Sequence, residues 1–406
     1  MDCCKKFVLM ALASLALGAC DDNSPPSVET VGRFPHCTEQ ARHDTCFELN
    51  NASDVQYSTL EQTPERFDID ADGQPMAVQL VWGSDFFNSI THSAQGQVLA
   101  VGGPRLQLSD VSGPASAPWQ TQRFSEYGDV LRAAALADDG TAFAVGSHGV
   151  ILAREPGKAA WERHNQVFSR LDDPARKALE FDGDAYGVAI ADARHAVVVG
   201  EERMLRTEDG GLHWKRVPYP LKDIALQDVQ FVDPQTGWAV GSGGTLLRSR
   251  DQGKTWHKVQ APLGAAHLMG LDFNDPGHGC VAGGYKVWCT VDGGEQWHEG
   301  VLDIPIDMSL SDRIGFTRVR FQDAERGWLV GKNGLVMRTA DGGQHWHYVT
   351  HLSRLQGQTL TNAELWGLTI ANGRVWAAGI GWTGEQTYGS NSLRSGGLVV
   401  SWAIEP

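Results

Sequence analysis

The chain has few basic residues for its length. Its 34 lysines and arginines are outnumbered by 49 aspartates and glutamates, which gives a formal net charge of −15 at pH 7. A chain with this charge repels the phosphates of DNA and RNA, and the excess charge favours solubility instead. We therefore expect no nucleic-acid partner.

The motifs of several common enzyme classes are absent as well. The sequence holds no Gly-x-Ser-x-Gly, no phosphate-binding P-loop, no dinucleotide-binding fingerprint and no His-Glu-x-x-His zinc motif. We expect no cofactor, no bound metal and no catalytic residue.

Long hydrophobic runs are scarce, and a short one lies at the start of the chain. Two lysines precede an apolar run from Phe7 to Leu17, which is too short to remain as a membrane-spanning helix. The run ends in Leu17-Gly18-Ala19-Cys20, which resembles the bacterial lipobox. We predict a lipoprotein signal peptide over residues 1–19, with lipid attached to Cys20. The alternative is an ordinary cleaved signal with an incidental cysteine.

This signal places the mature chain in the cell envelope, facing the periplasm and anchored by lipid to the inner or the outer membrane. Asp21 and Asp22 resemble the inner-membrane retention signal of enteric-type bacteria. Four cysteines remain outside the signal region, an even number in an oxidising compartment. The simplest pairing is two local disulfides, and zinc binding is the alternative. The pairs are Cys37–Cys46 and Cys280–Cys289.

The body of the chain is a repeat. The pattern Ser/Thr-x-Asp-x-Gly-x-x-Trp, the Asp box, occurs four times, and 42, 41 and 49 residues separate its successive tryptophans. This spacing is typical of a four-stranded propeller blade. The boxes are Thr207–Trp214, Ser249–Trp256, Thr290–Trp297 and Thr339–Trp346.

One blade can be predicted strand by strand, over residues 228–232, 238–241, 245–249 and 256–259. Three degenerate copies bring the count to seven blades, so we predict an all-β, seven-bladed, monomeric propeller over residues 76–406. Residues 20–75 form a tether with a disulfide-stapled segment. The strand Met76–Trp82 is free to complete the last blade and close the ring. The degenerate copies contain Leu99–Gly102, Phe143–Gly146 and Val375–Gly379.

The repeated box residues have structural roles. The glycine adopts a turn conformation that a Cβ opposes, the aspartate accepts backbone N–H groups, and the tryptophan is buried between neighbouring sheets. A catalytic acid is needed once, whereas these acids recur in every good blade. The residues are Asp209, Gly211, Trp214, Asp251, Gly253, Trp256, Asp292, Gly294, Trp297, Asp341, Gly343 and Trp346.

Alignment of the blades also places Cys280 and Cys289 opposite each other in an antiparallel hairpin, within disulfide range. One further recurrence is an arginine directly before the box: Arg206, Arg248 and Arg338. An arc of guanidinium groups is a candidate surface for binding a partner's carboxylates or phosphates. The alternative is that each arginine covers its own blade and pairs with nearby acids.

Two other clusters suggest metals. Asp68, Asp70 and Asp72, followed by Gly73, resemble the opening of a calcium loop, but the twelfth position is Gln79, so a solvated turn is favoured. His345, His347 and His351 lie close together, and a strand surface explains them better than a metal site does.

The phrases from Gly237 to Trp256 and from Gly327 to Gly343 resemble the repeat of the photosystem II stability/assembly factor family, a group that also occurs in non-photosynthetic bacteria. This resemblance covers residues 80–404. It implies a non-enzymatic scaffold that binds an envelope membrane protein or complex and assists assembly or stability, and it makes the three arginines part of a basic surface.

A second resemblance is to sialidases and other Asp-box glycoside hydrolases, or to glycan-binding propellers. Sialidases need an Arg-Ile-Pro motif, which is absent, and a tyrosine nucleophile with its glutamate. Other glycosidases need two carboxylates. Asp184, Glu201 and Glu202 lie in plausible loops, and nothing in the sequence distinguishes them from solvated acids.

Overall fold

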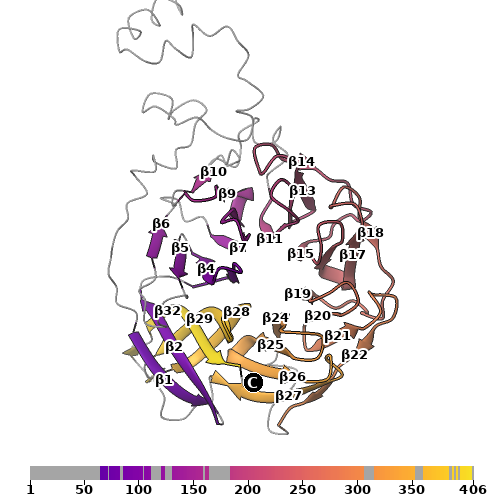
Figure 1. Ribbon diagram of the computed structural model, residues 1–406. Helices are drawn as coiled ribbons and strands as arrows, with labels where there is room; N and C mark the ends of the chain where they lie inside the picture. Colours follow the sequence, from indigo (N-terminus) through magenta and orange to yellow (C-terminus); the bar gives the residue numbers. More distant parts are fainter. Residues whose placement is uncertain are drawn as a thin grey trace, which may run out of the picture.

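The computed structural model describes residues 65–71, 73–82, 86–103, 105–110, 120–123, 130–158, 161–163, 183–305, 315–352, 360–383, 386–387, 390–391 and 394–404. Their strands form seven sheets of four or five strands and one two-stranded ribbon. The sheets stand around a ring (Figure 1). The prediction of an all-β propeller is confirmed.

Five sheets each consist of four consecutive antiparallel strands. The first strand of each lies at the centre of the ring and the fourth lies outside (Figure 1). The predicted blade agrees closely with β15 to β18. The sheets are β3 (Ser89–His92), β4 (Gln97–Gly102), β5 (Arg105–Asp110) and β6 (Gln120–Arg123); β7 (Leu131–Leu136), β8 (Ala142–Gly146), β9 (Ile151–Arg154) and β10 (Glu162–Arg163); β11 (Ala185–Ile190), β12 (Ala196–Gly200), β13 (Arg203–Thr207) and β14 (Lys215–Arg216); β15 (Leu226–Phe231), β16 (Gly237–Gly241), β17 (Thr245–Ser249) and β18 (His257–Lys258); and β19 (Leu268–Phe273), β20 (Gly279–Gly283), β21 (Lys286–Thr290) and β22 (His298–Glu299).

Two sheets have five strands. In one, a short strand pairs in parallel with the outermost strand of a regular sheet. In the other, called the closing sheet, three strands from the end of the chain pair with two from its start. These are β23 (Val301–Asp303) with β24 (Phe316–Phe321), β25 (Gly327–Gly331), β26 (Leu335–Thr339) and β27 (His345–His351); and β28 (Leu360–Ala371), β29 (Arg374–Thr383) and β32 (Arg394–Ala403) with β2 (Gln74–Trp82) and β1 (Glu65–Ala71). The ribbon is β30 (Gln386–Thr387) with β31 (Ser390–Asn391), and the short 3-10 turns η3, η4 and η5 are Ser147–Gly149, Ser242–Gly244 and Lys332–Gly334.

The closing sheet confirms the predicted join. The strand β2 pairs with β32 from Met76 opposite Trp402 to Trp82 opposite Gly396, and the indigo β2 lies beside the yellow β32 in Figure 1. This pairing covers the strand edge at which the ring would otherwise remain open.

The predicted domain boundary before Met76 is wrong, because β1 belongs to the same sheet. It pairs with β2 along its whole length, and Ile69 is buried in the core between exposed Asp68 and Asp70. The segment that resembles the opening of a calcium loop is therefore largely a hairpin: Asp70 Oδ1 accepts a hydrogen bond of 2.7 Å from the Gly73 backbone. Asp72 lies outside the described residues, as do Cys20, Cys37 and Cys46.

The core of the propeller is divided among the joints between neighbouring sheets. Each hydrophobic cluster contains residues from two adjacent sheets, and together the clusters run around the ring. Each box tryptophan packs towards the sheet before its own: Trp256 and Trp346 are buried, and Trp214 and Trp297 are partly buried. The predicted tryptophan role is confirmed.

Each Asp box forms the same network of hydrogen bonds. In the second box, Asp251 Oδ1 accepts from the backbone of Thr255 at 2.9 Å, as predicted. The Ser249 hydroxyl donates to Asp251 at 2.8 Å and accepts from the Gly253 backbone at 2.9 Å. The sequence had not indicated this hydroxyl role. It explains why serine or threonine opens every box, since only a hydroxyl can donate and accept at one atom.

The predicted bridge between Cys280 and Cys289 is confirmed. The two residues are directly opposite in β20 and β21, and their sulfur atoms are bonded. Both are buried, and Gly343 of the next sheet packs against them.

Gly343 provides a test of this packing. Its φ is +85°, and a Cβ there would lie 2.3 Å from the Cys289 sulfur, whereas at Gly373, with φ +68°, a Cβ would meet nothing within 4 Å. Both Gly→Ala substitutions carry the left-handed backbone cost, but only G343A overpacks the core. We expect urea unfolding to show G343A less stable than G373A by about 1–3 kcal/mol. Equal losses of stability in the two variants would contradict the close packing of Gly343 against the disulfide.

The box carboxylates make the fold sensitive to acid. Burial raises the pKa of Asp341, but hydrogen bonds from His345 and Thr339 lower it by more, so that the pKa lies below its ordinary value. The pKa is also lowered at Asp209, Asp251 and Asp292. A carboxyl whose pKa is lower in the folded chain contributes stability above its unfolded pKa, and this contribution is lost as the pH falls through the folded value.

We therefore expect the free energy of unfolding to fall from about pH 5 towards pH 2. Urea titrations across this range measure it, and Asp341→Asn, which cannot ionise, should show a shallower decline. An identical pH profile for the variant would rule out this contribution.

Candidate functional site

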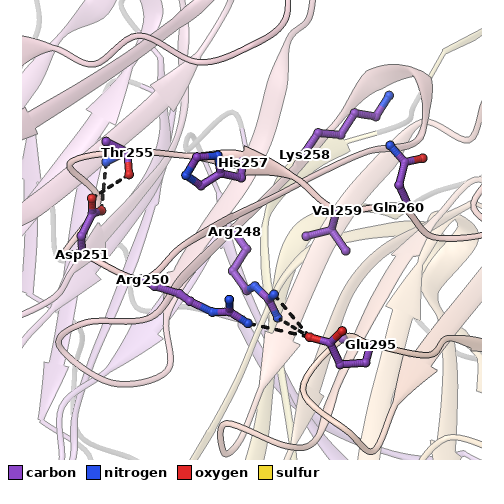
Figure 2. Close-up of a pocket in the computed structure, with 10 residues that line it drawn as sticks. Arg248, Arg250, Asp251, Thr255, His257, Lys258, Val259, Gln260 and Glu295 are labelled. Carbon is purple, nitrogen blue, oxygen red and sulfur yellow. Dashed lines mark hydrogen bonds and ion pairs between the residues drawn. The ribbon is translucent and has the colours of Figure 1, made fainter.

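A groove of about 580 Å³ lies between the β15–β18 sheet and the β19–β22 sheet, and we call it the basic groove. Four consecutive parts of one sheet build one wall: the end of β17, the Asp box, β18 and the residues after it. The next box supplies the other wall. Figure 2 shows the lining residues, which are Arg248, Arg250, Asp251, Thr255, His257, Lys258, Val259, Gln260, Gly294 and Glu295.

Arg248 is held firmly at the base of this groove. It lies opposite Trp238 in the ladder, and its guanidinium carbon is 5.1 Å from the centre of that indole. Its Nη1 donates to the Gly293 carbonyl at 2.9 Å, and its Nη2 lies 3.4 Å from Glu295 Oε1. The side chain therefore joins two sheets while part of it still lines the groove.

The groove carries more positive than negative charge in an acidic chain. Arg250, with 68% of its side chain exposed, reaches the same Glu295 oxygen at 3.7 Å (Figure 2). Lys258 is exposed, whereas Asp251 uses its oxygens within its own turn. Two arginines meeting one exposed carboxylate can exchange it for a carboxylate of a partner, because surface ion pairs are weak.

The three arginines predicted to form an arc occupy equivalent positions but differ in exposure. Each arginine lies on β13, β17 or β26, opposite the second residue of the strand that precedes it in the chain, β12, β16 or β25. Arg206 is buried: its Nε donates to the Gln252 carbonyl in the next box at 2.8 Å, and it pairs with Glu208. Arg338 is exposed, because the closing sheet that follows it lacks an Asp box. Only Arg248 lines the basic groove.

A second polar region lies at the centre of the ring and was missed in the sequence. There, side chains of one inner strand bond to the backbone edge of the next. Asp228 accepts from Leu271, Asp272 accepts from Phe321, and Thr317 donates to Leu365. These bonds satisfy strand edges that no further strand covers. Asp228, Asp272 and Phe321 line a channel of about 780 Å³.

The sequence model of the family described as "Photosynthesis system II assembly factor YCF48" matches residues 173–262 and 255–369. These stretches hold all four Asp boxes and every residue that lines the basic groove. The chain belongs to this Ycf48 family.

Individual relatives of the Ycf48-family chain are distant. Photosystem II assembly lipoprotein Ycf48 of Synechococcus sp. (strain CC9902) is 28% identical over 105 residues, which cover 22% of this chain and 30% of the relative. The match thus spans less than a third of that relative's length. Ycf48 from Cyanidioschyzon merolae has 16% identity and a TM-score of 0.53, covering 79% of this chain and 96% of its own.

The same fold also occurs in an enzyme. A virginiamycin B lyase from Staphylococcus aureus has 12% identity and a TM-score of 0.57, covering 84% of this chain and 100% of its own. Likeness at this level describes the fold alone, so the function of this Ycf48-family chain has to be argued from its sites.

One cluster in this Ycf48-family chain has the residue types of a glycosidase. The Tyr186 hydroxyl donates to Glu201 at 2.7 Å, and Arg132 pairs with Asp184 at 2.6 Å. Burial first, and then the Glu201 carboxylate, raise the pKa of Tyr186. The Glu201 carboxylate accepts the hydrogen bond of this hydroxyl, which is the contact that a general base makes with a hydroxyl nucleophile.

The histidines that the sequence grouped are separated by the fold. His345 pairs with Asp341 at 2.7 Å, His347 lies 3.4 Å from Asp303, and His351 is buried. In the part of the chain that the structure describes, no three His, Cys, Asp or Glu side chains are grouped to hold a metal. That same part contains no helix with the length and apolar character needed to cross a membrane.

Proposed function

We propose that the chain is a lipid-anchored, seven-bladed propeller of the cell envelope that binds a partner protein and assists assembly or stability of a membrane complex or transporter, without catalysing a reaction. Seven sheets of four or five strands support the blade count. The lipobox-like sequence before Cys20 supports the anchor, as does the name of the Synechococcus relative, an assembly lipoprotein. Nothing in the proposal requires photosystem II as the partner.

The basic groove is the observation that carries this proposal. Arg248, Arg250 and Lys258 gather there on a chain of net charge −15, within the region that the family model matches. A local basic surface on an acidic protein selects an acidic segment and repels most other contacts. We therefore propose an acidic, exposed segment of an envelope membrane protein as the ligand. Arg338 extends the basic surface, and Arg206 stabilises the joint between two sheets.

Deletion of the gene tests the function. We expect one membrane complex to accumulate less in the deletion strain, as measured by quantitative proteomics of native membrane complexes. Expression of the wild-type chain should restore it, and the variant Arg248→Glu with Arg250→Glu should not. Unchanged levels of every membrane complex would refute an assembly role.

A glycoside hydrolase is the second candidate, and the Tyr186–Glu201 pair is the observation that favours it. Turnover of a glycoside by the purified chain, abolished by Glu201→Gln, would establish this alternative. We expect no such turnover, because the Arg-Ile-Pro motif that sialidases need is absent from the sequence.

A further inference from the structure

The channel at the centre of the ring is a cavity distinct from the basic groove. Its volume is about 780 Å³, and all seven inner strands contribute to its wall. Small-molecule sites commonly have volumes of about 300–1,000 Å³. The channel is therefore large enough for a small organic ligand.

Two arginines on one inner strand face this channel. Arg318 and Arg320 are two residues apart on β24, so their side chains leave the same side of the strand. Arg318 Nη1 donates to the carbonyls of Met269 at 2.5 Å and Thr317 at 2.7 Å. Arg320 Nη1 donates to Leu271 at 2.6 Å and Val319 at 2.9 Å.

These contacts use one terminal nitrogen of each guanidinium. A guanidinium has five N–H groups in a planar fork, which matches the two oxygens of a carboxylate. Among the described residues, no other contact is made by the remaining nitrogens of Arg318, and they are accessible from the channel. Both side chains therefore have donors available for a ligand.

The charges around the two arginines are unequal. Arg320 lies 3.7 Å from the carboxylate of Asp272, whereas no carboxylate in the described part of the chain lies within 4 Å of Arg318. The acid beside it, Asp228, is occupied by the backbone N–H groups of Leu271 and Val229. Burial lowers the pKa of Arg318. A cation held mainly by carbonyl oxygens inside a protein is costly unless an anion accompanies it.

The other titratable groups of the channel restrict where an anion can lie. Asp138, Asp139 and Asp192 line the end of the channel at which the inner strands have their C-terminal ends. Their carboxylates repel an anion there. His92 is bonded to the Thr369 hydroxyl at 2.7 Å, and burial lowers its pKa, so it is neutral at pH 7. The arginine pair is thus the one part of the lining, among the described residues, with permanent positive charge.

We propose that the central channel binds a small organic carboxylate, with Arg318 as its anchor and Arg320 beside it. This site is independent of the basic groove, so its failure would leave the proposed partner binding untouched.

Calorimetry of the purified mature chain with succinate at constant ionic strength tests the proposal. We expect saturable binding of one succinate, affinity lower by at least about tenfold in Arg318→Gln, and an intermediate affinity in Arg318→Lys. The control Arg326→Gln, at an exposed arginine that lines neither the groove nor the channel, should bind as the wild type does. Absence of saturable heat, equal affinity in Arg318→Gln, or equally tight binding of inorganic phosphate would overturn the carboxylate site.

A second measurement does not depend on the folding of any variant. Crystals of the wild-type chain soaked in bromosuccinate should give an anomalous bromine peak in the channel beside Arg318. Bromine found solely on the outer surface would overturn the proposal.

Discussion

Reversing two charges in the basic groove, by Arg248→Glu with Arg250→Glu, is expected to weaken capture of the membrane partner about 100-fold, or about 2.7 kcal/mol. Arg248 is the anchored base of the groove and Arg250 its exposed rim. In the variant, two glutamates join Glu295 and repel an acidic segment. The measurement is recovery of partner from detergent-solubilised membranes over a series of bait concentrations, quantified by mass spectrometry.

A matched control carries the same change in charge elsewhere. Lys286 is half-buried and Arg326 is exposed, each pairs with an acid of its own sheet at 2.8 Å, and neither lines the groove. Lys286→Glu with Arg326→Glu should capture the partner as well as the wild type does. Because Arg248 also joins two sheets, Arg250→Glu alone is the milder variant, and we expect it to lose about tenfold. Equal losses in control and groove variants would show that net charge alone governs capture.

Removal of the disulfide, by Cys280→Ala with Cys289→Ala, is expected to lower the free energy of unfolding by about 3 kcal/mol. The bridge closes a short loop between residues nine apart and restricts the unfolded chain. It also fills the joint against Trp346, where both sulfur atoms are buried. Urea unfolding at pH 7 gives the value.

Reductant separates the two effects of this substitution. It should destabilise the wild-type chain by more than the double variant, which keeps the predicted Cys37–Cys46 bridge. If the free energy of unfolding falls by less than about 1 kcal/mol, or if reductant does not destabilise the wild type, the bridge contributes little to stability.

The repeats and their alignment could be predicted from the sequence, because the bounds and the pairing of these strands depend on residues of a single sheet. The strand Thr245–Ser249 has the predicted bounds, and Cys280 was placed opposite Cys289 by comparison with the neighbouring blade. The join at Met76 was also correct, since a ring has to cover its last edge. The strand β1 was missed because its alternating aspartates looked like a loop, although Ile69 between them is buried.

The particular residues that a side chain meets in the next sheet could not be predicted. Arg206 and Arg338 occupy the same position in the repeat, and their exposure differs because one faces an Asp box in the next sheet and the other does not. The channel arginines reach carbonyl groups 49 residues away in the chain, which no local pattern reveals. Sites between blades therefore had to come from the structure.

Site-specific photocrosslinking in intact cells tests most directly whether the basic groove binds a partner. The crosslinker would replace Gln260, which is exposed in the groove, and in a control it would replace Lys158, which is exposed in a turn between β9 and β10. We predict an adduct from position 260 that contains an envelope membrane protein joined through an acidic segment, and none from position 158. The absence of any adduct at position 260, or the same adducts from both positions, would contradict partner binding in the basic groove.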